Sequence, residues 1–296
     1  MEWRPGWPVD LQATLGVLRR GGSDPAHRFV AGELWRVALT PDGPATLLLR
    51  VTGGVVSARA WGPGAAWTID GVPELLGARD DLTGFTPEHP RLRDSWRRHP
   101  GLRIPRTRLV LDQLIPAILE QKVTGAEARR SWRELCQRYG EPAPGPVPAG
   151  MRVPPAPTVL GRLSDADWHR AGVTPQRRHT LRRACLVADR LEEAVGMPPA
   201  GALARLRAVP GIGAWTAAEV AQRALGDADA VSVGDFHLPA LVGWALTGRP
   251  LDDPAMLRLL APYAPHRHRV VRLIELSGVR KPRFGPRLPA RDYRAM

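Results

Sequence analysis

The sequence predicts a mainly helical α+β protein in which a small antiparallel β domain precedes a larger helical region. Residues 28–60 hold strand-like apolar runs between turn residues, whereas from about Phe85 onward the apolar residues follow a helical period. A chain of 296 residues is too long for one ordinary core and suits two or three packed domains. We therefore place a mixed or β domain at 1–86, a helical region at 87–280 and a basic tail at 281–296.

The expected β domain rests on three apolar runs. Phe29–Leu39 and Ala45–Val51 flank the turn residues Thr40–Pro44, and the run Val55–Ala60 follows a pair of glycines at 53 and 54. Strands separated by such short turns pair with their sequence neighbours. A small antiparallel sheet is therefore expected.

The helical region begins with a segment whose apolar residues recur at three- and four-residue spacing and which ends near Gln121 and Lys122. Its apolar side is formed by Leu109, Leu111, Leu114, Ile115, Ile118 and Leu119. Pro116 is expected to bend this helix, and Gly140 to end a second helix over Ala126–Tyr139. Further helices are expected at 181–195, 200–208, 215–225, 237–246 and 265–276.

Between these helices lies a proline-rich connection at 141–158. It holds seven prolines between Glu141 and Pro157 and has no apolar period. Such a composition favours an extended conformation on the surface. We expect it to link two helical subdomains that flank a cleft.

Composition excludes several classes of protein. The chain has no apolar run near 18 residues and no charged region followed by an apolar stretch at its start, so we expect a cytoplasmic protein with no membrane association. Its two cysteines, Cys136 and Cys185, have no CxxC spacing, which excludes an iron–sulfur cluster held by four cysteines and indicates two buried, reduced thiols. Neither GxxxxGK[ST] nor HExxH occurs, and no cofactor is expected.

A formal net charge of +13 indicates an anionic partner, and nucleic acid is the first candidate. The alternative is a GC-rich genome, because all but two of the 42 basic residues are arginine. At the end of the chain, Arg280–Met296 combines six basic residues with three prolines. We expect a frayed, solvated tail there; the alternative is a tail that touches DNA phosphates.

The most informative segment is Leu203–Ala221, which includes Val209-Pro210-Gly211-Ile212-Gly213-Ala214-Trp215-Thr216. A short helix ends before Pro210, and a new helix begins around Trp215 after a turn in which side chains at Gly211 and Gly213 would obstruct. The N–H groups at the start of the second helix can hold a phosphate without reading sequence. The alternative is an ordinary turn between helices.

This hairpin, followed about twenty residues later by Val233-Gly234-Asp235, resembles the helix-hairpin-helix DNA glycosylase superfamily. The continuation Trp215-Thr216-Ala217 resembles the bacterial 3-methyladenine DNA glycosylase II branch. The resemblance runs from about residue 28 to 278 and includes His89–Leu92, Arg98–Pro105 and Ala117–Val123. It implies a monomeric enzyme that flips a damaged base out of double-stranded DNA, with DNA contacts at Val209, Gly211, Ile212, Gly213 and Thr216.

The resemblance matches Asp235 to the family's catalytic aspartate. Breaking a glycosidic bond develops positive charge on the sugar, which a nearby carboxylate stabilises. The alternative role for Asp235 is to cap the helix that follows, and both roles are compatible. Asp227 and Asp229 lie in the preceding loop and are expected to be caps or solvated charges.

Where lyase members of the superfamily place a lysine nucleophile, this chain has Trp215, and neither Lys122 nor Lys281 lies near the motif. We therefore expect a monofunctional enzyme. The Trp215 indole is a candidate surface for an extruded, cationic alkylated base; its alternative is a core tryptophan at a helix start.

The resemblance implies further residues of the base pocket. Gln121 and Tyr263 fall at matching positions, and His266 replaces the aromatic residue that the branch tends to show. Lys122 takes the position of the wedge that fills the gap in the duplex, where the branch more often has an apolar residue. The alternative for Lys122 is an ordinary surface lysine, and the alternative for His266 is a surface histidine.

The resemblance also suggests a monovalent cation shared between a DNA phosphate and the carbonyls of Val209 and Ile212. The leading hypothesis is a glycosylase for alkylated bases of the 3-methyladenine type, acting in base excision repair. Two alternatives stay open: a glycosylase for deaminated or oxidised bases, and a non-catalytic helix-hairpin-helix protein that binds DNA.

Overall fold

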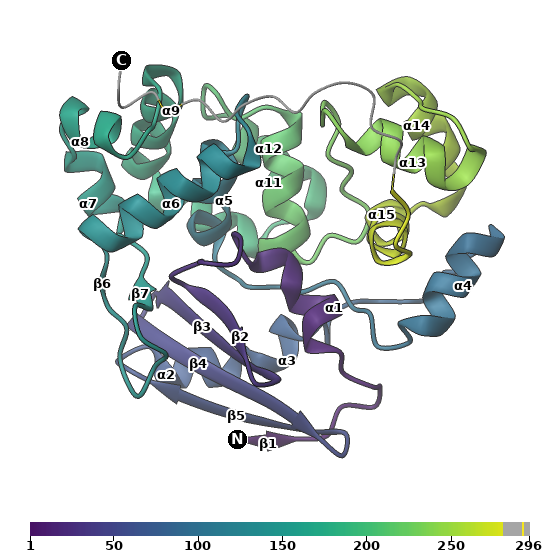
Figure 1. The fold of residues 1–296 in the computed structure, drawn as a ribbon, viewed down its shortest axis with the longest axis horizontal. Coiled ribbons are helices and arrows are strands. Elements are labelled where there is room, and N and C mark those ends of the chain that lie inside the picture. Colours follow the sequence, from purple (N-terminus) through teal and green to yellow (C-terminus); the bar gives the residue numbers. More distant parts are fainter. Residues whose placement is uncertain (281–291, 293–296) are drawn as a thin grey trace.

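A computed structural model describes residues 1–280 and 292 of the chain. The predicted basic tail at 281–296, apart from Asp292, lies outside the described residues. Figure 1 shows a twisted sheet on one side of the molecule and a larger group of helices on the other. This arrangement confirms the predicted class, a mainly helical α+β protein.

The sheet has five antiparallel strands in the order β1-β5-β4-β3-β2. The strands are β1 (Glu2–Trp3), β2 (His27–Val30), β3 (Glu33–Thr40), β4 (Gly43–Thr52) and β5 (Val55–Trp61). The two-residue turn at 41–42 pairs Thr40 with Gly43, and Gly53-Gly54 pairs Thr52 with Val55. Each tight turn fixes the register of its hairpin. The sheet inferred from residues 28–60 is therefore present, with β1 added at its edge.

One face of the sheet is buried against short helices. Leu34, Leu47, Leu49 and Val56 form a core with residues of α1 (Leu11–Leu15) and α3 (Val72–Leu75). The 3-10 turn η1 (Gly16–Leu18) follows α1, and α2 (Ala65–Asp70) precedes α3. These helices lie within the region that the sequence assigned to the β domain.

The proline-rich connection is extended and lies largely at the surface between α6 and α7, as predicted, but it also packs on the sheet. It forms a small hairpin of β6 (Glu141–Pro142) and β7 (Arg152–Val153), and β7 packs on β3. Met151 and Val153 are buried in one cluster with Trp35 and Val37 of the sheet. Alternate residues of an extended chain face the same side, so these two side chains cover the outer face of the sheet together.

The first group of helices surrounds α5 (Val110–Leu119), which is buried along almost its whole length. Its members share one core, and they are α6 (Gly125–Tyr139), α7 (Pro157–Arg162), α8 (Asp165–Arg170), α9 (Pro175–Leu186), α10 (Ala188–Glu192), η2 (Glu193–Gly196), α11 (Pro199–Arg207), α12 (Ala214–Val220) and η3 (Ala221–Leu225). The predicted helix at 181–195 begins earlier, at Pro175, and is interrupted at Val187. Pro175 at the first helical position marks this earlier start in the sequence.

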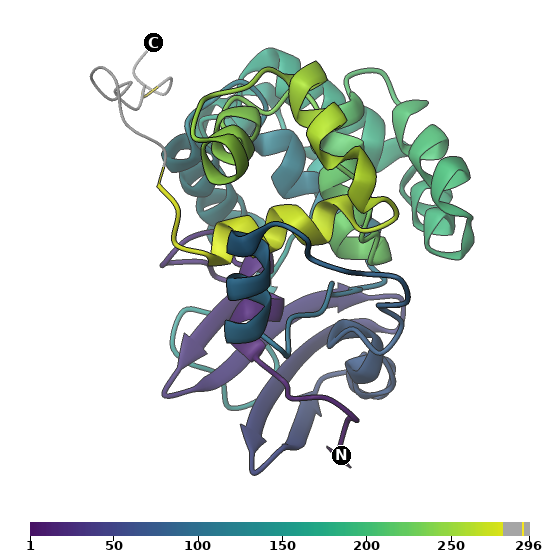
Figure 2. The same cartoon turned by 90° about the vertical axis from the view of Figure 1, so that its right-hand side faces the viewer.

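The second group holds α4 (Pro90–Arg98), α13 (Leu238–Thr247), α14 (Asp253–Leu260), η4 (Ala261–Tyr263) and α15 (Arg267–Leu276). Leu92, Val242, Met256 and Val270 contribute to its core. Figure 2 shows α15 on the side of this group that is nearer the sheet, and α4 packs against α15. In the part of the chain that the structure describes, no helix has the length and apolar character that crossing a membrane requires.

Candidate active site

The hairpin predicted from the glycines occupies residues 208–213, between α11 and α12. Gly211 has φ +100°, and a Cβ there would lie 2.2 Å from Oγ1 of Thr180. Only glycine fits this position without strain. Gly213 differs from the prediction: its φ is −90°, and a Cβ there would meet no atom within 4 Å. Its missing side chain leaves the outer surface of the hairpin open.

Gln121 and Lys122 lie in the loop between α5 and α6, close to the hairpin. The side-chain amide of Gln121 donates to the Gly211 carbonyl at 3.0 Å and to Oγ1 of Thr216 at 2.9 Å. Lys122 is exposed and has φ +54°, a left-handed conformation that is rare for residues with a side chain. Gln121 therefore ties this loop to the hairpin, and Lys122 projects from it.

Asp235 lies in the loop between η3 and α13, where it accepts three hydrogen bonds. Its Oδ1 accepts the backbone N–H groups of His237 and Leu238 at 2.7 and 2.8 Å, at the start of α13. Its Oδ2 accepts the indole N–H of Trp215 at 3.0 Å. Oδ1 therefore binds main-chain donors at the start of α13, in line with the capping alternative, although the residue directly before α13 is His237. The carboxylate is also held from a second side by the first turn of α12, which fixes its direction.

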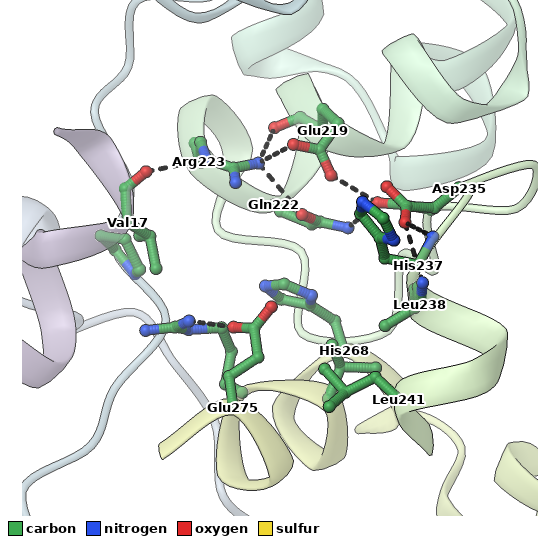
Figure 3. Close-up of a pocket in the computed structure, with 14 residues that line it drawn as sticks. Val17, Glu219, Gln222, Arg223, Asp235, His237, Leu238, Leu241, His268 and Glu275 are labelled. Carbon is green, nitrogen blue, oxygen red and sulfur yellow. Dashed lines mark hydrogen bonds and ion pairs between the residues drawn. The ribbon is translucent and has the colours of Figure 1, made fainter. Parts of the chain in front are cut away.

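A cavity of about 130 Å³ lies beside Asp235. Figure 3 shows side chains from three directions around it: Glu219, Gln222 and Arg223 from α12 and η3, Leu238 and Leu241 from α13, and His268 and Glu275 from α15. Asp235 is itself one of the lining residues. The predicted carboxylate therefore faces a hollow, as an enzyme acting on an extruded base requires.

The N-terminal segment completes the cavity. Val17 of η1 is a lining residue, and its carbonyl accepts a hydrogen bond of 3.2 Å from Nε of Arg223. Arg272 of α15 likewise donates to the carbonyl of Ala13 at 3.1 Å. Two guanidinium groups of the helical region are thus anchored on the backbone that leads into the sheet.

The other predicted pocket residues lie elsewhere. His266 is buried, contacts the carbonyl of Thr83 at 3.1 Å through Nε2 and packs edge-on against Phe85. Tyr263 packs against the core of the second helical group. Neither lines the cavity. Gln121 and Trp215 do not line it either: Gln121 is hydrogen-bonded to the hairpin, and Trp215 is hydrogen-bonded to Asp235. The placement of His266 on the surface was also wrong, because it fills the space under the loop at 81–85.

Two histidines line the cavity, His237 and His268, and the sequence analysis singled out neither of them as a site residue. Burial lowers the pKa of His268 well below its usual range, and the positive charges of Arg272, Arg223 and Arg269 lower it further. Its signal in the sequence was helical spacing: His268, Arg272 and Glu275 share one face of α15.

Asp227 and Asp229, the acidic neighbours in sequence, have structural roles. Oδ1 of Asp227 accepts the N–H groups of Asp229 and Ala230 at 2.8 and 3.0 Å. Asp229 forms a two-pronged ion pair with Arg267. Neither lines the cavity, which leaves Asp235 as the carboxylate of this loop that does. Among the described residues, no group of three or more His, Cys, Asp or Glu side chains is arranged to hold a metal ion.

Comparison with known proteins identifies sequence relatives in two strains of one bacterium. No protein-family model matches the chain. A probable bifunctional transcriptional activator/DNA repair enzyme AlkA of Mycobacterium tuberculosis is 30% identical over 199 residues, or 66% of this chain. The matched region spans 36% of that relative's length.

Solved structures of low sequence identity share the fold. A 3-methyladenine DNA glycosylase of Archaeoglobus fulgidus superposes with a TM-score of 0.74 at 14% identity, over 94% of this chain and 98% of its own. An 8-oxoguanine glycosylase/lyase of Clostridium acetobutylicum, solved with double-stranded DNA, gives a TM-score of 0.69 at 13% identity, over 93% and 96%. Together with the AlkA relative, these neighbours confirm the resemblance seen in the hairpin and the aspartate that follows it.

Proposed function

Because the chain has the fold of the helix-hairpin-helix DNA glycosylases, we propose that it excises alkylated bases of the 3-methyladenine type from duplex DNA. One observation carries the proposal: the carboxylate of Asp235, which is held from two sides, lines a cavity beside the helix that follows the hairpin. In this reaction the base leaves the stack, enters the cavity and loses its bond to the sugar. The products are a free base and an abasic site.

The chemistry follows from the charge that develops on the sugar. As the glycosidic bond lengthens, its electron pair leaves with the base, and the sugar gains positive charge that water then quenches. Asp235 at the cavity wall stabilises that charge, and its three hydrogen bonds keep the carboxylate from turning away. Preorganisation of this kind requires no rearrangement at the moment of reaction.

The charges around the cavity support a cationic base. Its lining holds three carboxylates, Glu219, Asp235 and Glu275, and two guanidinium groups, Arg223 and Arg272. Alkylation of a purine ring nitrogen in DNA places a positive charge on the base. Glu219 and Glu275 pair with these guanidinium groups, so Asp235 is the lining carboxylate whose charge can attract an alkylated base more than a neutral one.

The hairpin and the Lys122 loop supply the proposed DNA contacts. The open surface at Gly213 leaves room for a phosphate to approach the backbone, and exposed Lys122 is placed to fill the space that a flipped base vacates. The net charge of +13 adds attraction that does not depend on sequence. A monovalent cation fits here chemically, because the Val209 carbonyl accepts one hydrogen bond, from Ile212 N–H, and keeps a second lone pair. Held by the Val209 and Ile212 carbonyls, such an ion would add positive charge beside the phosphate.

We propose that the enzyme stops at the abasic site. Strand cleavage of the lyase type needs an amine that forms a Schiff base with the sugar. Trp215 occupies the position after the hairpin, and its N–H is used by Asp235. The reaction should therefore yield abasic DNA that remains intact until alkali is added, and borohydride should trap no covalent complex.

The decisive test compares two isosteric substitutions. Asp235→Asn should lower release of 3-methyladenine from methylated duplex DNA by about 100-fold or more, with the affinity for abasic-site DNA kept. Asp227→Asn is the matched control, because an asparagine oxygen still accepts the two N–H groups of that turn. Release that stays near the unsubstituted rate in Asp235→Asn would exclude the proposed role. Absence of base release by the unsubstituted protein, with DNA binding retained, would favour a non-catalytic DNA-binding protein.

A further inference from the structure

One face of α15 forms a wall of the cavity. His268, Val271, Arg272 and Glu275 are all lining residues and follow the spacing i, i+3, i+4 and i+7. Of the three polar residues on this face, His268 is the most buried, with 7% of its surface exposed. The helix thus presents one buried imidazole to the hollow next to Asp235.

Most polar groups on the opposite wall are occupied by one another. Glu219 accepts the Ser232 hydroxyl at 2.6 Å and pairs with Arg223 at 2.8 Å. The amide nitrogen of Gln222 donates to Ser232 and to the Ala230 carbonyl, and its oxygen accepts from Arg223. On α15, Arg272 pairs with Glu275. These groups shape the cavity and leave little hydrogen-bonding capacity for a ligand.

His268 is the exception. Within residues 1–280 it makes no hydrogen bond, and Figure 3 shows its ring directed into the cavity between Glu275 and Gln222. A neutral imidazole offers one donor and one acceptor, and a ligand in the cavity can pair with both. Burial and three neighbouring guanidinium groups lower the pKa of His268 and keep the ring neutral, so both capacities are available to a ligand.

We infer that His268 is a specificity-determining residue that forms a hydrogen bond with an edge of the nucleobase inside this cavity. The inference rests on the proposed function and deepens it. A cavity of about 150 Å³ holds a benzene ring, so the 130 Å³ here has room for about one ring of a base entering edge-first. The selection of the base then depends on a hydrogen bond to one imidazole as well as on charge. A site built around such a bond rejects bases that lack the matching group.

Base release by three proteins tests the inference. The unsubstituted enzyme, His268→Phe and His268→Gln are compared on duplexes that carry 3-methyladenine, 7-methylguanine or hypoxanthine. We expect His268→Phe to lower release of the preferred base about tenfold or more and to reduce the ratio between the best and worst bases by a similar factor. Glutamine keeps a donor and an acceptor and should restore part of both. Affinity for abasic-site DNA, which has no base to contact, should be the same for all three.

Nitrogen NMR of the histidine rings makes the test independent of turnover. Free 3-methyladenine added to the full-length protein should shift the ring-nitrogen signals that are missing from His268→Phe. If no duplex base is released but this shift occurs, the proposed reaction fails and the base-binding role of His268 stands. If bases are released and His268→Phe leaves their ratios unchanged with its melting temperature intact, the inference is overturned. A lack of shift together with unchanged ratios would overturn it as well.

Discussion

The indole N–H of Trp215 donates a hydrogen bond to Oδ2 of Asp235 at 3.0 Å, although twenty positions of sequence separate the two residues. The bond joins the first turn of α12 to the loop that precedes α13. The two helices belong to different helical groups, so this contact ties the hairpin to the cavity across the boundary between them.

Replacement of Trp215 by Phe should reduce base release while preserving an aromatic ring. A hydrogen bond to a charged group contributes about 1.5–3 kcal/mol, which corresponds to roughly a tenfold to hundredfold loss of rate. Single-turnover release of 3-methyladenine measures the effect. Trp61→Phe is the control, because Trp61 stacks on Trp35 at the sheet, and it should release bases normally. An unchanged rate in Trp215→Phe would show that the two main-chain donors suffice to hold Asp235.

Alanine at the two hairpin glycines should separate folding from DNA binding. Gly211→Ala places a methyl group against Thr180 at φ +100° and should lower the free energy of unfolding by about 1–3 kcal/mol. Gly213→Ala meets nothing inside the protein and should change stability by less than about 0.5 kcal/mol. Its affinity for duplex DNA should fall about tenfold, because the methyl group stands where a phosphate approaches. Urea unfolding and fluorescence anisotropy measure the two effects, and full affinity in Gly213→Ala would place the phosphate elsewhere.

Lys122→Gly should make the protein more stable and less active. The left-handed backbone at Lys122, with φ +54°, costs about 1 kcal/mol that glycine avoids. The substitution also removes the proposed wedge and one positive charge, so base release from duplex DNA should fall. The slope of log affinity against log salt should decrease in magnitude by about 0.9 if the amine contacts a phosphate. Normal release from a fully paired duplex would mean that another side chain fills the gap.

Stability should decrease as the pH falls below about 6.5, in part because of His27. Burial is the main cause that lowers the pKa of His27 from 6.5 to about 3. The positive charges of Arg36, Arg19 and Arg20 lower it further. The unfolded chain therefore binds a proton below pH 6.5 that the folded chain refuses until about pH 3, and stability is lost across that window. Between pH 7 and pH 5 the loss from this group is about 2 kcal/mol. Urea unfolding of His27→Phe should show a decline smaller by that amount, and an equal decline in both proteins would contradict the assignment.

The sequence predicted the local elements of the site more accurately than the contacts between them. Helices around α5 and α6, the hairpin and the loop position of Asp235 all follow from apolar spacing, glycines and capping residues close in sequence. The Trp215–Asp235 bond depends on how two helical groups pack, and no local pattern encodes it.

Two contacts were not predicted: the burial of His266 away from the cavity, and the packing of the proline-rich segment on the sheet. The resemblance places His266 in the base pocket, at a position where the branch tends to show an aromatic residue. His266 directly precedes α15, and the loop before the helix sets its direction, whereas His268 inside α15 shares the face of Arg272 and Glu275. The proline-rich segment was judged on composition alone. The alternation of Met151 and Val153 was the signal that it packs on the sheet.

The hydrogen bonds from Arg223 to Val17 and from Arg272 to Ala13 connect the helical region to the segment before the sheet. A fragment that begins after the sheet would lack both carbonyl acceptors and the lining residue Val17, and the two guanidinium groups beside the cavity would lose these anchors. Under the proposed function, the amino-terminal part therefore belongs to the active site and is not an independent accessory domain.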